Sequence, residues 1–293
     1  MKDREAARAA QELDEDDEEQ LLEEELIEGQ TVDEVAKSLH AVLKTHGPAY
    51  VPLFQNMLPL ARKYLQERDP AARQWAICVF DDLVEFAGPA SAQFAGDFLD
   101  AIAVALRQTE SPDLRQAAAY GVGIMAKSGG DAYADFIIAT ALPAMLEMIG
   151  RPDARETENI FATENMVSAV AKVLRVYVSR LGGDAQAVLQ AWFAALPVCN
   201  DDEEVPGVYE YLVQMLRENP EALLAGNDPR AVKHLVKVVV EALAVCTLPQ
   251  ELAQALVGVM QGTLASFDDA AKAALWAEIP REQQQALQDK GLI

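Results

Sequence analysis

The chain has 293 residues, 51% of them hydrophobic, and its 47 acidic residues against 24 basic ones give a formal net charge of −23. This charge argues against sequence-independent binding to nucleic acid or to an anionic membrane, and it favours basic protein partners. The sequence begins without the apolar segment of a signal peptide, and no uncharged apolar run reaches 18 residues. We therefore expect a soluble, intracellular protein that neither is secreted nor spans a membrane.

The first 30 residues are predicted to be an acidic, flexible or partly helical lead-in. Eleven carboxylates and no cation lie between residues 12 and 28, and such a run repels itself. Thr31 is then predicted to cap a helix over 32–46, because Glu34 follows three residues later and completes a capping box. The first repeating unit is expected to begin here.

Glycine-containing turns recur along the rest of the chain and predict a repeat architecture. Taken at Gly47, Gly88, Gly130, Gly183 and Gly226, their spacings are 41, 42, 53 and 43 residues. The segment DPAARQWA at 69–76 also returns 42 residues later as SPDLRQAA at 111–118. A period near 40 in a helical chain is typical of HEAT or armadillo repeats. The single long interval predicts an insertion at about 156–163.

The expected fold is an all-α, right-handed HEAT-repeat solenoid with irregular C-terminal capping helices. Residues 31–246 would form about five repeats, and residues 247–293 would cap the open apolar end. The predicted helix pairs are 32–46 with 49–66, 70–87 with 90–108, 112–127 with 131–149, 159–181 with 184–196, and 203–218 with 229–246. Three shorter helices are expected at 249–265, 268–277 and 280–290.

Sequence signals for catalysis or cofactor binding are sparse. The three histidines, His40, His46 and His234, belong to no metal-binding motif, and no phosphate-binding loop or nucleophile elbow occurs. Cys78, Cys199 and Cys246 are far apart in sequence and are interpreted as reduced core residues. Gly121 and Gly123 lie inside a predicted helix, so they favour close helix packing over dinucleotide binding. We expect no enzyme activity, no cofactor and no metal.

Several charged residues are candidates for either structure or binding. Arg73 and Arg115 occupy equivalent repeat positions and are expected to bridge neighbouring repeats, to a carboxylate such as Asp113 or to a helix-end carbonyl. Asp81 and Asp82 are assigned to ladder contacts between repeats, although paired acids can also bind metal. In a HEAT array the second helices line the concave side. The candidate residues that would face basic cargo from there are Asp97, Asp100, Asp135 and Glu147.

Four sequence runs resemble a known family. They are RQWAICVFDDLVEFAGPAS at 73–91, RQAAAYGVGIMAKSGGDAY at 115–133, ATENMVSAV at 162–170 and IPREQQQAL at 279–287. In this order they resemble the carboxyl-terminal HEAT repeats of the importin-beta superfamily, closest to the importin-five or karyopherin-beta-three branch. The similarity covers about residues 31–293.

This resemblance implies a segment of a nuclear transport receptor. Such receptors bind basic protein cargo, contact Phe-Gly nucleoporins, respond to the Ran GTPase and shuttle between cytoplasm and nucleus. A monomer is expected, without direct contact to nucleic acid or membrane. The alternative is a HEAT-repeat scaffold or regulatory subunit of another protein assembly.

Overall fold

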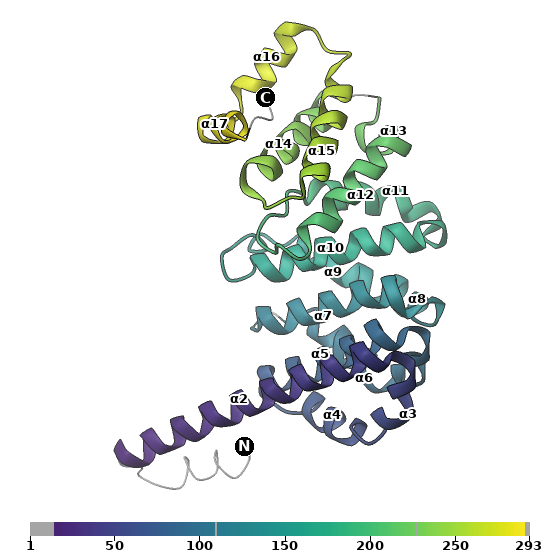
Figure 1. The fold of residues 1–293 in the computed structure, drawn as a ribbon. Coiled ribbons are helices and arrows are strands. Elements are labelled where there is room, and N and C mark those ends of the chain that lie inside the picture. The colour runs from purple at the N-terminus through teal and green to yellow at the C-terminus, as the bar shows by residue number, and fades with distance from the viewer. Residues whose placement is uncertain (1–14, 109, 227, 291–293) are drawn as a thin grey trace.

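The computed structural model describes residues 15–108, 110–226 and 228–290, and the side chains of residues 15–26 and Glu28 lie outside that description. All regular elements in the described residues are helices, and Figure 1 shows them stacked in chain order between the two termini. The expectation of an all-α solenoid is confirmed.

One row of helices stacks through the whole molecule. Each member packs against the next, so this row is the continuous wall of first helices that a HEAT array requires. Its members are α2 (Glu15–His46), α5 (Pro70–Ala87), α7 (Pro112–Ile124), α10 (Ile160–Tyr177), α12 (Val205–Glu218) and α15 (Gln250–Leu264).

The second helices are shorter and more broken than predicted. Prolines and short 3-10 or π turns divide two of the expected helices, 49–66 and 131–149, into pieces. The second row consists of α3 (Val51–Phe54), α4 (Leu58–Leu65), α6 (Ala95–Ala105), α8 (Ala134–Phe136), α9 (Leu142–Ile149), α11 (Ala185–Ala194) and α13 (Pro220–Leu224).

The repeated sequence features perform the same local task in each repeat. Asp69 and Ser111 cap α5 and α7 by accepting backbone N–H groups, and a proline follows each of them at the first helical position. The turns at Gly88 and Gly130 have φ of +57° and +75°, a region that favours glycine. In the fourth turn the positive φ belongs to Gly182, not to the expected Gly183.

The start of the first helix differs from the prediction. Helix α2 begins at Glu15, so the described part of the acidic run is the first half of this helix; residues 12–14 lie outside the described residues. Thr31 is therefore mid-helix, and its hydroxyl donates to the carbonyl of Ile27 (2.8 Å) instead of capping the chain. The capping-box prediction was wrong because the helical conformation continues through the acidic segment.

The insertion forms the turns between α9 and α10. These turns run from Arg151 to Asn159, somewhat earlier than predicted, and α10 begins at Ile160. Thr163 on α10 donates to the Ala154 carbonyl (2.7 Å), and the Asn159 amide donates to the Asp153 carbonyl (3.0 Å). The insertion is thus fastened to the helix that follows it.

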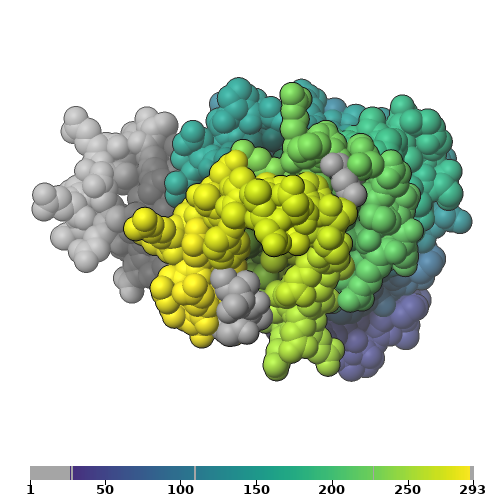
Figure 2. All heavy atoms as spheres, turned by 90° about the horizontal axis from the view of Figure 1, so that it is seen from above, coloured from purple at the N-terminus to yellow at the C-terminus, as the bar shows by residue number. Residues whose placement is uncertain are grey.

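The C-terminal end departs from the predicted pairing. Helix α12 packs against α13 and α15, whereas α14 (Pro229–Val245) packs against α15 and α17 (Arg281–Asp289), so 203–218 does not pair mainly with 229–246. Lys290 closes this end by donating to the carbonyls of Leu243 (2.7 Å) and Ala244. Helix α16 spans Asp269–Ala277. Figure 2 shows the helices from α14 to α17 across the end of the stack.

One apolar stretch among the described residues, Asp131–Ile149, contributes several residues to the core. At 19 residues and a mean hydropathy of 1.4, Asp131–Ile149 is long and apolar enough by composition to span a membrane. Tyr133, Ile137 and Met145 within it have no exposed surface and belong to the core shared by neighbouring repeats.

Candidate protein-binding surface

The four predicted cargo-facing carboxylates lie on second helices of two consecutive repeats. Asp97 and Asp100 are on α6, Asp135 is on α8 and Glu147 is on α9. Three of the four form ion pairs with an arginine of an adjacent repeat. The pairs are Arg62–Asp97 at 2.5 Å, Arg107–Glu147 at 3.3 Å and Arg180–Asp135 at 2.7 Å.

Exposure separates these carboxylates into two kinds. The side chain of Asp97 is only 16% exposed beneath Arg62, so its pairing serves the contact between repeats. Those of Asp135 and Glu147 are 93% and 65% exposed, and Asp100 is also exposed. Exposed ion pairs are weak. Arg180 and Arg107 therefore hold Asp135 and Glu147 only weakly.

The first helices carry a different polar arrangement, which we call the first-helix ladder: His40, Asp82, Glu85, Tyr120, Lys172 and Glu204. His40 shares a hydrogen bond with Asp82 (2.9 Å), and the Tyr120 hydroxyl donates to Glu85 (3.3 Å). Lys172 lies over the Tyr120 ring and donates to Glu204 at 2.6 Å. The ladder connects α2, α5, α7, α10 and the start of α12, and it places Asp82 in contacts between repeats.

Asp81 is next to the ladder but does not join it. Its side chain is 2% exposed, and neither carboxylate oxygen has a hydrogen-bond partner among the described residues. Burial, followed by the charges of Asp82 and Glu85, raises the pKa of Asp81 well above its usual value. The carboxyl group lies against Gly121 of α7, where any side chain would collide with it.

Arg115 bridges two repeats, as its repeated position suggested. It is 4% exposed and donates to the Gln108 carbonyl after α6 and to the side-chain oxygen of Asn159 before α10. These contacts use a carbonyl near a helix end rather than Asp113. The equivalent Arg73 has a buried Nε without a partner in the described part of the chain.

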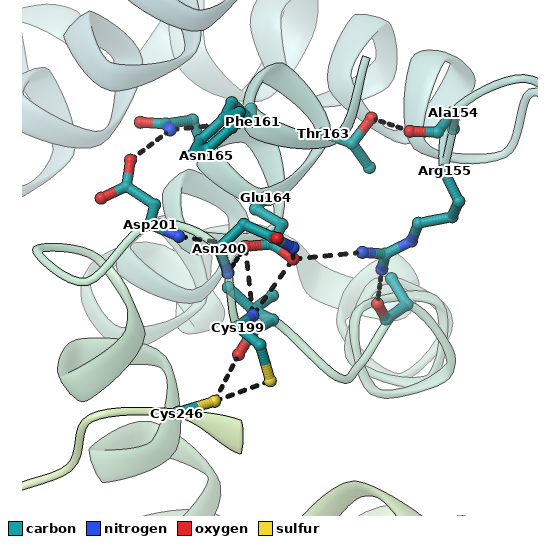
Figure 3. A network of polar contacts seen from close by, with 12 residues as sticks. Ala154, Arg155, Phe161, Thr163, Glu164, Asn165, Cys199, Asn200, Asp201 and Cys246 are labelled. Carbon is teal, nitrogen blue, oxygen red and sulfur yellow. Dashed lines mark hydrogen bonds and ion pairs between the residues drawn. The ribbon is translucent and has the colours of Figure 1, made fainter. Parts of the chain in front are cut away.

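Sequence reasoning missed a buried carboxylate that organises the loop before α12 (Figure 3). Glu164 on α10 is 1% exposed, and it accepts from the backbone N–H groups of Cys199 (3.1 Å) and Asn200 (2.7 Å) and from the Asn200 side chain. Asn165 beside it donates to Asp201 (2.8 Å). The available signal was a group of polar residues, Thr163, Glu164, Asn165 and Ser168, within a predicted helix that is mostly apolar.

The described residues offer no group of three His, Cys, Asp or Glu side chains placed to hold a metal ion. The prediction that all three cysteines are core residues is wrong for Cys78, since only Cys246 is buried and Cys199 is partly exposed. Cys78 is exposed on α5, whereas Cys199 is in the loop before α12 and Cys246 follows the end of α14.

In sequence, this chain is similar to importins. The family model described as Importin repeat 6 matches residues 1–67. Importin subunit beta-3 of Saccharomyces cerevisiae is 29% identical over 269 residues, covering 91% of this chain and 24% of that protein. The probable importin-5 homolog of Dictyostelium discoideum is 24% identical over 214 residues, covering 70% and 20%.

Several solved structures of the karyopherin Kap121p also resemble this chain. Kap121p bound to RanGTP superposes with a TM-score of 0.74 at 23% identity, covering 92% of this chain and 24% of Kap121p. Other similar crystal structures hold Kap121p bound to Pho4p and to Nup53p. The chain spans about a quarter of the length of these relatives or less.

Proposed function

Because this chain belongs to the importin-beta superfamily, we propose that it is a stretch of C-terminal HEAT repeats from a nuclear transport receptor, with a role in binding rather than chemistry. The observation that carries the proposal is the similarity to importin subunit beta-3 along 91% of the chain, on a matching solenoid. The relatives named are importins, which are transport receptors and not enzymes.

The proposed ligand of this stretch is a basic segment of a protein cargo. Asp100, Asp135 and Glu147 present exposed carboxylates on consecutive second helices, within a chain of net charge −23. Carboxylates in this arrangement accept charge-assisted hydrogen bonds from lysine and arginine, and the overall field attracts a basic chain. This attraction weakens as salt shortens the screening length.

The partners of the whole receptor follow from its relatives. Kap121p binds RanGTP, Pho4p and Nup53p, as the similar structures show for that protein. We extend to the receptor containing this chain the same classes of partner: the Ran GTPase, protein cargo and a nucleoporin. Its proposed location is the cytoplasm and nucleus, with transient binding at the pore, and the chain itself is proposed to be monomeric.

Binding to immobilised ligands tests this function. The purified chain is passed over a lysine- and arginine-rich cargo peptide, Phe-Gly repeats and RanGTP, beside a full-length importin. We expect retention on the basic peptide at 50 mM salt and reduced retention at 300 mM. Absence of retention on all three ligands at low salt would overturn the proposal.

A further inference from the structure

Two cysteines from separate segments meet beside the loop that Glu164 holds. Cys199 lies between α11 and α12, and Cys246 follows α14, 47 residues later. Figure 3 shows the two side chains turned toward each other. The Cys246 and Cys199 sulfurs lie 2.6 Å apart, and both residues are free cysteines in the structure.

The backbone on both sides of this contact is fixed. Glu164 accepts from the N–H groups of Cys199 and Asn200, and the Tyr209 hydroxyl bonds both the carbonyl (3.0 Å) and the N–H (3.2 Å) of Val198. The Cys246 N–H caps α14 by donating to the Ala242 carbonyl (3.0 Å). The pairing of the sulfurs is therefore imposed by the fold and not by two mobile side chains.

We propose that Cys199 and Cys246 are a redox-sensitive pair that a peroxide converts reversibly into a disulfide. The Cys199 thiolate attacks one peroxide oxygen, which gives a sulfenic acid and releases water after protonation. Cys246 then attacks the Cys199 sulfur, and the sulfenic hydroxyl leaves as the second water. Two thiols and one hydrogen peroxide thus yield one disulfide and two waters, and a dithiol reductant reverses the change.

The surroundings assign different roles to the two sulfurs. Cys199 is partly exposed, whereas Cys246 is buried, so a peroxide from solvent reaches Cys199 first. The adjacent Cys199 side chain, followed by burial, raises the pKa of Cys246. Cys246 therefore remains a thiol until the oxidised Cys199 is beside it, which is the order of events in a peroxide-reacting and resolving pair.

The bond would fasten the C-terminal helices to the fourth repeat. It would join the end of α14 to the loop that leads from α11 into α12, closing a segment that contains all of α12, α13 and α14. Closing a loop of this length restricts the unfolded chain and should raise the melting temperature by roughly 5–10 °C. It would also limit movement at this junction of the solenoid.

Mass spectrometry of the oxidised chain tests the proposal directly. The experiment uses Cys78→Ser protein, which removes the exposed third thiol, treated with stoichiometric hydrogen peroxide. Trypsin should then release peptides 181–217 and 238–272 as one disulfide-linked species. Addition of dithiothreitol should separate them. The oxidised protein should melt about 5 °C or more above the reduced protein.

Single-cysteine variants provide the control. Added to the Cys78→Ser background, Cys199→Ser or Cys246→Ser should abolish the linked peptide and the rise in melting temperature. Recovery of both cysteines as separate alkylated or sulfinic-acid peptides from the peroxide-treated Cys78→Ser protein would overturn the proposal. That measurement is made with both cysteines of the pair present, so it decides the matter even if a single-cysteine variant folds poorly.

Discussion

The carboxyl group of Asp81 on α5 packs directly against Gly121 on α7: a Cβ built at Gly121 would lie 2.1 Å from Asp81 Oδ1. Two residues later, a Cβ at Gly123 would lie 3.0 Å from the Lys172 side chain of α10. Helix α7 therefore has a glycine toward each of its neighbours in the first-helix row. This close approach is the packing role that the pair of glycines suggested in the sequence.

Replacing Gly121 by alanine should destabilise the chain by about 2 kcal/mol. The added methyl group must displace a buried carboxyl group or push α5 and α7 apart, and overpacking of this kind typically costs about 1–3 kcal/mol. Urea denaturation of Gly121→Ala would measure the loss. The matched control is Gly258→Ala on α15, where nothing lies within 4 Å. That variant should be neutral or gain up to about 1 kcal/mol through helix propensity.

Asp81 should make stability fall as the pH rises. Burial is the main reason that the pKa of Asp81 is raised in the folded chain. In the unfolded chain the pKa of an aspartate is about 3.9. Above that value the folded state binds more protons than the unfolded state, so unfolding free energy decreases with increasing pH. Asp81→Asn cannot ionise, and it should raise the melting temperature at pH 7 by about 2–4 °C.

The pH dependence of this gain provides the check. Scanning calorimetry should show the advantage of Asp81→Asn shrinking toward pH 4, where the native aspartate is increasingly protonated in both states. Asp100→Asn, an exposed change on α6, should shift the melting temperature little at either pH. If Asp81→Asn raised the melting temperature equally at pH 4 and pH 7, the raised pKa of Asp81 would not be the cause of the stabilisation.

Glu164 should be required for the order of the loop before α12. Glu164→Ala removes the acceptor for the partly buried N–H groups of Cys199 and Asn200, a loss of about 2 kcal/mol. Hydrogen exchange should show faster exchange at these two amides. Glu210→Ala, at an exposed position of α12, should leave their exchange unchanged. Unaltered protection in Glu164→Ala would show that the loop is held by other contacts.

The sequence predicted correctly those features that depend only on neighbouring residues, such as helix caps and glycine turns. Asp69 and Ser111 cap their helices, and glycine turns end them, because these effects act within a few residues. Thr31 was misassigned because its capping box is also compatible with a helix interior. The predicted pairing of 203–218 with 229–246 was wrong because the sequence analysis did not identify the short helix α13. This helix packs against both α11 and α12, as the second helix of that repeat.

A polar contact between repeats could be predicted only where the same residue type recurs at equivalent positions of two repeats. Arg115 was found because Arg73 precedes it by one period. Glu164 and the Cys199–Cys246 contact join segments 35 or more residues apart, at sites where the period is interrupted. Their partners are fixed by the packing of helices, which a single sequence does not display. Burial of Asp81 likewise depends on Gly121 of the next repeat.

The central claim is that exposed carboxylates on the second helices hold basic cargo, and charge reversal tests it. The test variant carries Asp100→Lys, Asp135→Lys and Glu147→Lys. Its control carries the same number of reversals at exposed first-helix positions, Asp33→Lys, Glu210→Lys and Glu251→Lys. Both variants have the same net charge, so the overall field changes equally and only position differs.

Fluorescence anisotropy with a labelled lysine- and arginine-rich cargo peptide at 100 mM salt is the most direct measurement. The second-helix variant should bind roughly tenfold more weakly than the native chain, because three charge-assisted contacts become repulsive. The first-helix control should lose about twofold or less. Equal losses in the two variants would contradict the account, since bulk charge alone would then explain the binding.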